Sequence, residues 1–230
     1  MSKYTKKQLE EQLDLLKHEN RRYRRAMNQL CIDIDKTVEI NLNVNIDRKV
    51  HPNENALKSI NKGNSEWSYN VTEPNGDGNW QRINSYIKSI DGLGWTWEDD
   101  YVKDGQFAWC GAFVAYCYGD SVNIQVRKNT FSSCYRMSRD WTNSSRVQTK
   151  ENILPGDIVV VYTSKEQSPS YGNHITLVCS IPNELGDFDT IEGNANGAGP
   201  NQEWREGVSK RTRNLSEVAR VYRLIEEDYR

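Results

Sequence analysis

A heptad stripe near the N-terminus constrains this 230-residue chain more than any other sequence feature. Its residues are spaced alternately by four and three positions: Leu9, Leu13, Leu16, Asn20, Tyr23, Met27, Leu30 and Ile34. A single helix cannot bury so narrow a stripe, so the pattern predicts a coiled coil formed by self-association. Asn20 lies at a core position, where a polar side chain often fixes the register. We predict an oligomerisation helix over residues 1–35; the alternative is a helix docked on the chain's own globular body.

A strand pattern follows the heptads. Apolar residues alternate with polar ones at five positions, namely Val38, Ile40, Leu42, Val44 and Ile46. This period of two predicts a half-buried strand, which needs a pairing partner because a lone strand is not stable. His51-Pro52-Asn53 then indicates a boundary. We therefore predict an amphipathic strand and linker over residues 36–51, and a separate domain over residues 52–230.

Helical patterns precede strand patterns in the predicted domain. Helices are expected near residues 55–62, 80–90, 110–119 and 130–141. After Pro155 the apolar runs are short and typical of strands, at residues 157–162, 174–181, 189–192, 207–211 and 218–224. Helices followed by an antiparallel sheet make an α+β domain.

The composition and residue spacings exclude several classes of function. The 30 basic residues nearly balance the 32 acidic ones, which argues against a general nucleic-acid-binding surface. No apolar run approaches the roughly 18 residues of a membrane span, and no signal peptide is recognised at the N-terminus. The five cysteines contain no CxxC pair, and the acidic residues lack the spacing of a calcium loop. We therefore expect no cofactor, no metal, and neither a nucleic-acid nor a membrane partner.

The segment around Cys110 has the features of a catalytic cysteine site. A glycine-containing loop leads into a predicted helix that begins near Cys110. The positive end of a helix dipole favours a thiolate, and the unpaired backbone N–H groups of a first turn can bind an oxyanion. The cysteines at 117, 134 and 179 are predicted to be core residues instead.

His174 is the candidate general base, because His18 falls at a polar heptad position and His51 falls in the linker. It begins a predicted strand, and Glu192 and Asn194 are expected on one side of the next strand. A cysteine at a helix start, a histidine at a strand start and a polar residue that orients the imidazole make the general arrangement of a cysteine amidohydrolase.

Four segments, taken in order, resemble the CHAP domain, a family of cysteine, histidine-dependent amidohydrolases and peptidases within the NlpC/P60 and papain-like superfamily. The segments are Trp109–Val114, Pro155–Val160, His174 with the apolar run after it, and Ile191–Asn194. The resemblance covers about residues 54–224 and implies a papain-like, NlpC/P60-type domain of helices packed on an antiparallel sheet.

The resemblance also implies roles for four residues. Cys110 would be the nucleophile, and its backbone N–H would be one oxyanion donor. His174 would deprotonate Cys110 and later protonate the leaving amine. Glu192 and Asn194 would share the work of holding and orienting the imidazole. Thr176 stands where the family often has a glycine, a departure that concerns packing more than chemistry.

The usual substrate of the family is peptidoglycan, so the resemblance implies a cell-wall amidase or endopeptidase of bacteriophage origin. Without a signal peptide, such an enzyme must cross from the host cytoplasm through a holin, as an endolysin does, or ride on a virion. The predicted oligomerising segment favours a tail-associated protein assembled through residues 1–50. Two alternatives are a structural virion adaptor whose domain binds the wall or plugs the assembly without catalysis, and a cytosolic protease or deamidase of the same fold.

Overall fold

The computed structural model describes residues 53–72, 79–90, 107–123, 130–163, 170, 172–200 and 204–230. The chain divides into two units, Met1–His51 and Pro52–Arg230, and every described residue belongs to the second. The coiled coil predicted over residues 1–35 and the strand and linker predicted over residues 36–51 therefore lie outside the described residues. None of the helices within the described ranges is long and apolar enough to cross a membrane.

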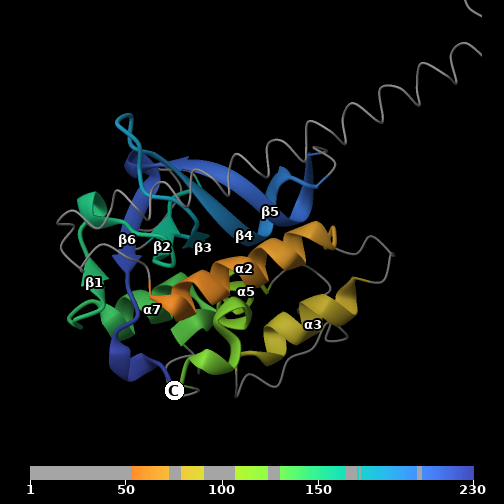
Figure 1. Cartoon of the computed structure of the whole chain (residues 1–230), viewed down its shortest axis with the longest axis horizontal. Helices are drawn as coiled ribbons and strands as arrows, with labels where there is room; N and C mark the ends of the chain where they lie inside the picture. Colours follow the sequence, from red (N-terminus) through yellow and green to blue (C-terminus); the bar gives the residue numbers. More distant parts are fainter. Residues whose placement is uncertain are drawn as a thin grey trace, which may run out of the picture. The chain divides into compact units, whose positions relative to one another are not determined.

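The described part of the second unit combines α-helices with one antiparallel sheet (Figure 1). The α-helices are α2 (Glu54–Ser68), α3 (Trp80–Lys88), α5 (Cys110–Tyr118) and α7 (Cys134–Trp141). The strands are β1 (Val147–Gln148), β2 (Ile158–Val161), β3 (His174–Val178), β4 (Asp187–Ala198), β5 (Trp204–Asn214) and β6 (Val218–Tyr222). They are ordered β1-β6-β2-β3-β4-β5, and each neighbouring pair is antiparallel. This arrangement confirms the predicted α+β class.

Short 3₁₀ helices connect these elements. They are η1 (Gly119–Ser121), η2 (Thr130–Ser132), η3 (Lys150–Asn152), η4 (Leu215–Glu217) and η5 (Glu226–Asp228). The single helix predicted over residues 130–141 is wrong, because Ser133 is extended and separates η2 from α7. The Ser133 hydroxyl accepts a hydrogen bond from the Arg136 N–H at 3.1 Å, so this residue caps α7 instead of continuing a helix into it.

Helix α2 is longer than predicted. It begins after Asn53, whose side-chain oxygen accepts a hydrogen bond from the Ala56 N–H at 2.8 Å, and it continues through Gly63 to Ser68. A Cβ atom at Gly63 would lie 3.0 Å from Cγ2 of Ile191, so this glycine lets the helix approach the sheet closely. Packing against the sheet thus stabilises the helix through Gly63, although glycine has a weak helix propensity.

Strands β4 and β5 are also longer than predicted, because the two pair along almost their whole length in one hairpin. The hairpin winds back on itself: Ala198 of β4 pairs both with Trp204 and with Lys210 of β5. Thr72 forms a further antiparallel bridge with Gly207 of β5. The two-residue strand β1 was not predicted, since a pair of residues shows no periodicity.

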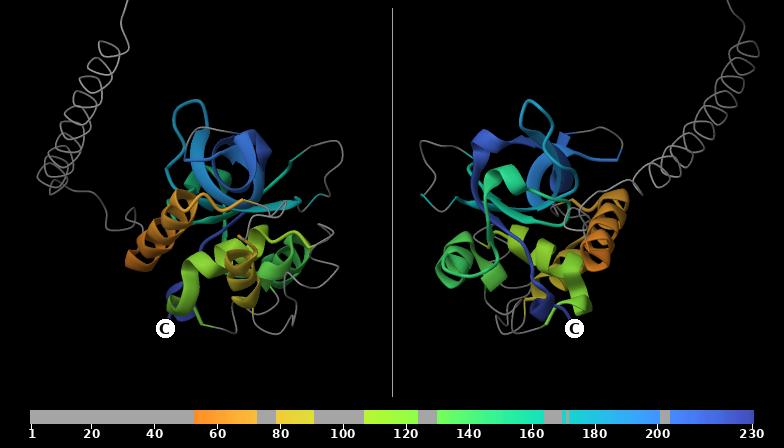
Figure 2. Two further views of the ribbon diagram at one scale, coloured as in Figure 1. Left: turned by 90° about the vertical axis from the view of Figure 1, so that its right-hand side faces the viewer. Right: turned by 60° about the vertical axis from the view of Figure 1, so that its left-hand side comes forward.

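Strand β2 is buried on both faces of the sheet, since all four of its residues are buried. Ile158 and Val160 join the main apolar cluster with residues of the helices. Val159 and Val161 join a second cluster with Phe188 and neighbouring apolar residues. This division follows the alternation of side chains along a strand. In both views of Figure 2 the α-helices lie together on one side of the sheet.

Helix α5 lies at the centre of the helical layer, where it contacts α2, α3, β3 and β4. Apart from the half-buried Tyr116 its side chains are buried, which is typical of a helix enclosed by other elements. The buried carboxylate of Glu66 in α2 ties the helices together. It accepts hydrogen bonds from Arg82 and Tyr86 of α3, at 3.0 and 2.6 Å, and from Tyr116 of α5 at 3.3 Å. The helix that begins at Cys110 is therefore held by its neighbours along its length.

Candidate active site

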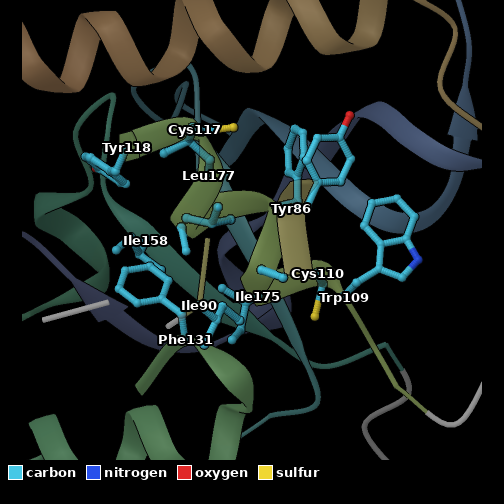
Figure 3. Close-up of a cluster of buried hydrophobic side chains, with 14 of the residues drawn as sticks. Tyr86, Ile90, Trp109, Cys110, Cys117, Tyr118, Phe131, Ile158, Ile175 and Leu177 are labelled. Atoms are coloured by element: carbon cyan, nitrogen blue, oxygen red, sulfur yellow. The ribbon is translucent and has the colours of Figure 1, made fainter. Parts of the chain in front are cut away.

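Cys110 is the first residue of α5, as predicted, and only 4% of it is exposed. Its sulfur accepts hydrogen bonds from the backbone N–H groups of Gly111 and Ile175. Figure 3 shows Cys110 beside Trp109 and Ile175, with Cys117 farther along the same helix. The backbone therefore surrounds this sulfur with hydrogen-bond donors at the positive end of a helix.

Gly111 makes this arrangement possible. A Cβ atom at residue 111 would lie 1.9 Å from the carbonyl oxygen of Phe131 and 2.9 Å from Cδ1 of Ile175. Only a residue without a side chain allows the backbone of η2 to pack so closely against the first turn of α5. The position of Cys110 thus depends on the glycine that follows it.

His174 is the first residue of β3, also as predicted, and it faces Cys110. Strand β3 pairs with β4 at Leu177 and Val178, whereas the N–H of Ile175, nearer the start of the strand, donates to the Cys110 sulfur. The first residues of β3 therefore contact the start of α5. This contact brings the histidine to the cysteine.

The carboxylate of Glu192 in β4 completes the group. Its Oε2 lies 3.0 Å from Nε2 of His174, and the glutamate is fully buried. Because Glu192 engages Nε2, the other ring nitrogen, Nδ1, is the one that remains for Cys110. Cys110 and His174 are hydrogen-bonded to each other. The structure thus brings Cys110, His174 and Glu192 together from a helix and two strands.

The surroundings favour a thiolate paired with an imidazolium. Burial by itself raises the pKa of Cys110, but the charge of His174, its hydrogen bond and the two N–H donors outweigh burial and leave that pKa below the usual value for a thiol. Burial lowers the pKa of His174, but the opposite charges and hydrogen bonds of Cys110 and Glu192 raise it to about 9. Each partner stabilises the charged form of the other.

The other described cysteines behave differently. Burial raises the pKa of Cys117 and of Cys134 well above the usual thiol value, and it raises that of Cys179 to about 12. Among the cysteines in the described ranges, Cys110 alone has a lowered pKa. The charges of Lys62 near Cys117 and of Lys210 near Cys179 lower those two pKa values by less than burial raises them. A buried thiol that stays protonated behaves as a small apolar residue.

Two residues that contact Glu192 were missed by sequence reasoning, Arg213 and Thr190. Arg213 donates from Nε to Oε1 and from Nη2 to Oε2, both at 2.7 Å, and the Thr190 hydroxyl donates to Oε1 at 2.6 Å. Burial raises the pKa of Glu192, but the hydrogen bonds from His174 and Arg213 hold it well below the usual range of a carboxyl group. The predicted strand ended at residue 211, so the pattern gave no sign that Arg213 faces a buried carboxylate.

Asn194 does not continue the regular strand geometry on which its predicted placement relied. Its φ is 54°, and a bulge shifts the β4–β5 register between Glu192, which pairs with Ser209, and Ala195, which pairs with Gly207. The alternation that would place Glu192 and Asn194 on one side is interrupted there. The geometry assigns the contact with the imidazole to Glu192, while Asn194 lies half-buried in the bulge.

The remaining features give no second centre of this kind. In the part of the chain that the structure describes, no group of three or more His, Cys, Asp or Glu residues is arranged to hold a metal ion. A pocket of about 400 Å³ lies between α2 and the β4–β5 hairpin. It is lined by Ile60, Asn64, Cys179, Asp189, Thr190, Lys210, Arg211 and Thr212. Neither Cys110 nor His174 lines this pocket.

Comparison with protein-family models, with curated proteins and with solved structures finds no match for this chain. The geometry of Cys110, His174 and Glu192 and the motifs around them therefore indicate what the chain does. That geometry has the parts of a cysteine nucleophile site: a thiolate at a helix start, an imidazole beside it and a carboxylate that fixes the imidazole.

Proposed function

We propose that this chain is a cysteine amidohydrolase or peptidase that cleaves amide bonds of peptidoglycan. The observation that carries the proposal is the contact series from Cys110 to His174 to Glu192, in which the cysteine has a lowered pKa. A lowered thiol pKa in a buried site requires a specific arrangement of partners, and such arrangements are typical of functional sites.

Each of the three residues has a defined part in the proposed reaction. The Cys110 thiolate attacks the carbonyl carbon of the amide, and the backbone N–H of Cys110 stabilises the oxyanion. The C–N bond breaks as His174 gives its proton to the departing nitrogen, which leaves an amine and a thioester. Water then attacks the thioester while His174 takes its proton, and Cys110 departs as a thiolate. The products are an amine and a carboxylic acid, and Glu192 holds the imidazole throughout.

The choice of peptidoglycan is supported by the resemblance of the four motifs to CHAP domains, as is a papain-like, NlpC/P60-type fold. The packing of α5, with its N-terminal cysteine, against strands that carry the histidine and the carboxylate is consistent with that fold. We further propose that the protein is a virion-associated lysin or an endolysin, with residues 1–50 attaching it to an oligomer or a tail. The heptad stripe supports this placement.

Digestion of purified peptidoglycan tests the proposal. The full chain should release new amino groups from walls of a suitable chemotype, and mass spectrometry of the muropeptides should locate the broken bond. Free lactyl groups would identify an amidase, whereas cleaved stem or bridge peptides would identify an endopeptidase.

Protein treated with iodoacetamide is the control. If the chain cleaves proteins but none of the walls tested, which should span several chemotypes, it is instead a cytosolic protease or deamidase. If the chain binds walls but releases no amines, it is instead a structural adaptor.

The pH profile of hydrolysis should be bell-shaped. Activity is expected to rise with pH as Cys110, whose pKa is lowered, becomes a thiolate, and to fall near pH 9 as His174, whose pKa is raised to about 9, loses the proton that it gives to the amine. Initial rates of amine release, with circular dichroism at each pH to exclude unfolding, check this expectation. Activity that does not fall as the pH is raised through 9 would contradict the role assigned to His174.

A further inference from the structure

The site contains one more charged residue than the proposed reaction uses, Arg213. It is 3% exposed, Glu192 is fully buried, and His174 and Cys110 are 6% and 4% exposed. With the histidine protonated and the cysteine ionised, the charges alternate from Arg213 to Glu192 to His174 to Cys110, and they cancel. A buried charge is costly unless a neighbour of opposite sign compensates it. The ionised state of each member therefore depends on the next.

The contacts of Glu192 occupy both of its carboxylate oxygens. Oε1 accepts from Arg213 Nε at 2.7 Å and from the Thr190 hydroxyl at 2.6 Å, while Oε2 accepts from Arg213 Nη2 at 2.7 Å and contacts His174 at 3.0 Å. Two parallel hydrogen bonds from one guanidinium fix the plane of a carboxylate as well as its position. The oxygen that meets His174 is thereby held in place.

Arg213 is itself anchored from the far side. Its Nη1 donates to Oε1 of Glu217 in η4 at 3.1 Å, and Oε2 of Glu217 accepts from the N–H of Asn214 at 2.8 Å. The side chain of Glu217 is 34% exposed, so this contact lies nearer the solvent than the one with Glu192. The guanidinium is thus held between a partly exposed carboxylate and a buried one.

We propose that Arg213 is a positioning residue that acts through Glu192: it fixes and neutralises this carboxylate, so that the thiolate of Cys110 and the imidazolium of His174 can persist in a buried site. The inference rests on the proposed nucleophilic role of Cys110, but it is independent of the substrate. Arg213 touches neither reacting atom.

Removing the guanidinium should raise the pKa of Cys110 for two reasons. Loss of the cation leaves a net negative charge among the buried groups, which favours uptake of a proton and raises the pKa of Cys110. Loss of the two hydrogen bonds also leaves Glu192, and with it His174, less firmly held beside the cysteine. The ionisable neighbours of these groups on other elements are Cys134, Cys179 and Glu217. Burial keeps both of these thiols protonated at neutral pH, so neither adds to the thiolate signal of Cys110.

Thiolate absorbance near 240 nm, measured against pH, tests the proposal without any substrate. Each protein is compared with the same protein carrying Cys110→Ala, so that the difference reports Cys110 alone. Arg213→Met should move the midpoint of thiolate formation upward by about one pH unit, which means about tenfold less thiolate on the acidic side. Arg213→Lys should give a smaller shift, because lysine keeps the charge but cannot form two parallel hydrogen bonds.

Two controls separate positioning from a general charge effect. Arg211 is a second cation of the same strand, and its guanidinium donates to the carbonyl oxygen of Asn196 at 3.0 Å. Arg211→Met should therefore leave the midpoint of thiolate formation unchanged. In a Glu192→Gln background, Arg213→Met should shift the midpoint much less than it does alone, because the residue through which it acts is already altered. Equal shifts in both backgrounds, or an equal shift from Arg211→Met, would overturn the proposal.

Thr190→Val keeps the test decisive even if Arg213→Met does not fold. It removes only the hydroxyl that donates to Glu192, so it should shift the midpoint upward by less than Arg213→Met. Unchanged midpoints in folded Thr190→Val and Arg213→Lys proteins would overturn the inference. An ordinary thiol midpoint for Cys110 in the unaltered protein would instead refute its role as nucleophile. A low midpoint without wall cleavage would refute the substrate and leave the role of Arg213 standing.

Discussion

Protein carrying Cys110→Ala is expected to release no new amines from peptidoglycan, with a fall in the rate of about 10⁴-fold or more. Alanine keeps the helix start but removes the only sulfur of α5 that lies beside His174 and receives the two backbone N–H groups. Without a nucleophile no thioester forms, and water would have to attack the amide directly. Amine release from purified walls, measured beside the unaltered protein, checks this expectation.

Cys117→Ala is the matched control, because Cys117 is buried in the same helix and its pKa is raised by burial. It loses a sulfur of equal size from the apolar core, so it should retain hydrolysis and lose only modest stability. The thermal midpoint of Cys110→Ala should also stay close to that of the unaltered protein. Wall cleavage by folded Cys110→Ala protein at the normal rate would refute the proposed chemistry.

Gly111→Ala is expected to lower the free energy of unfolding by about 3 kcal/mol and to reduce hydrolysis strongly. The new Cβ would lie 1.9 Å from the backbone oxygen of Phe131, so either η2 or the first turn of α5 must move. Movement of that turn displaces Cys110 from His174 and from the N–H of Ile175. A displacement of about 1 Å in a reacting group is enough to cost roughly 10²-fold in rate.

Gly63→Ala provides the comparison, since it also adds a methyl group inside a helix. Its Cβ would meet the Cγ2 methyl of Ile191 at 3.0 Å, and a side chain can yield where a backbone cannot. Alanine is also the better helix former. Urea unfolding and amine release, measured on both variants, should show a much larger loss for Gly111→Ala. Equal losses would show that the contact with Phe131 does not determine the position of Cys110.

Local signals explain what could be predicted from the sequence. The bounds of α5 follow from an unbroken apolar run that ends at Gly119, whose φ of 54° suits glycine at a helix end. The start of β3 at His174 follows from the apolar run after it. Cys110 and His174 were placed correctly at the starts of their elements, because such boundaries depend on neighbouring residues.

Contacts between distant segments explain what could not be predicted. A Cβ at Gly193 would lie 2.4 Å from Cβ of Phe113 and 2.6 Å from Cζ3 of Trp109, so β4 passes very close to α5 just where the bulge at Asn194 occurs. No short window of sequence contains that approach. The pairing of Glu192 with Arg213 likewise arises only once β4 and β5 are aligned, because each residue taken alone reads as a polar position of a strand.

The winding of the β4–β5 hairpin has a consequence for the behaviour of the protein at high concentration. Strand β5 lies at the end of the sheet, where exposed N–H and C=O groups can template edge-to-edge aggregation. Ala198 and Thr72 pair with this strand at Lys210 and Gly207, so part of its outer edge is already covered by the chain itself. Two copies of the domain are therefore less able to join edge to edge through β5.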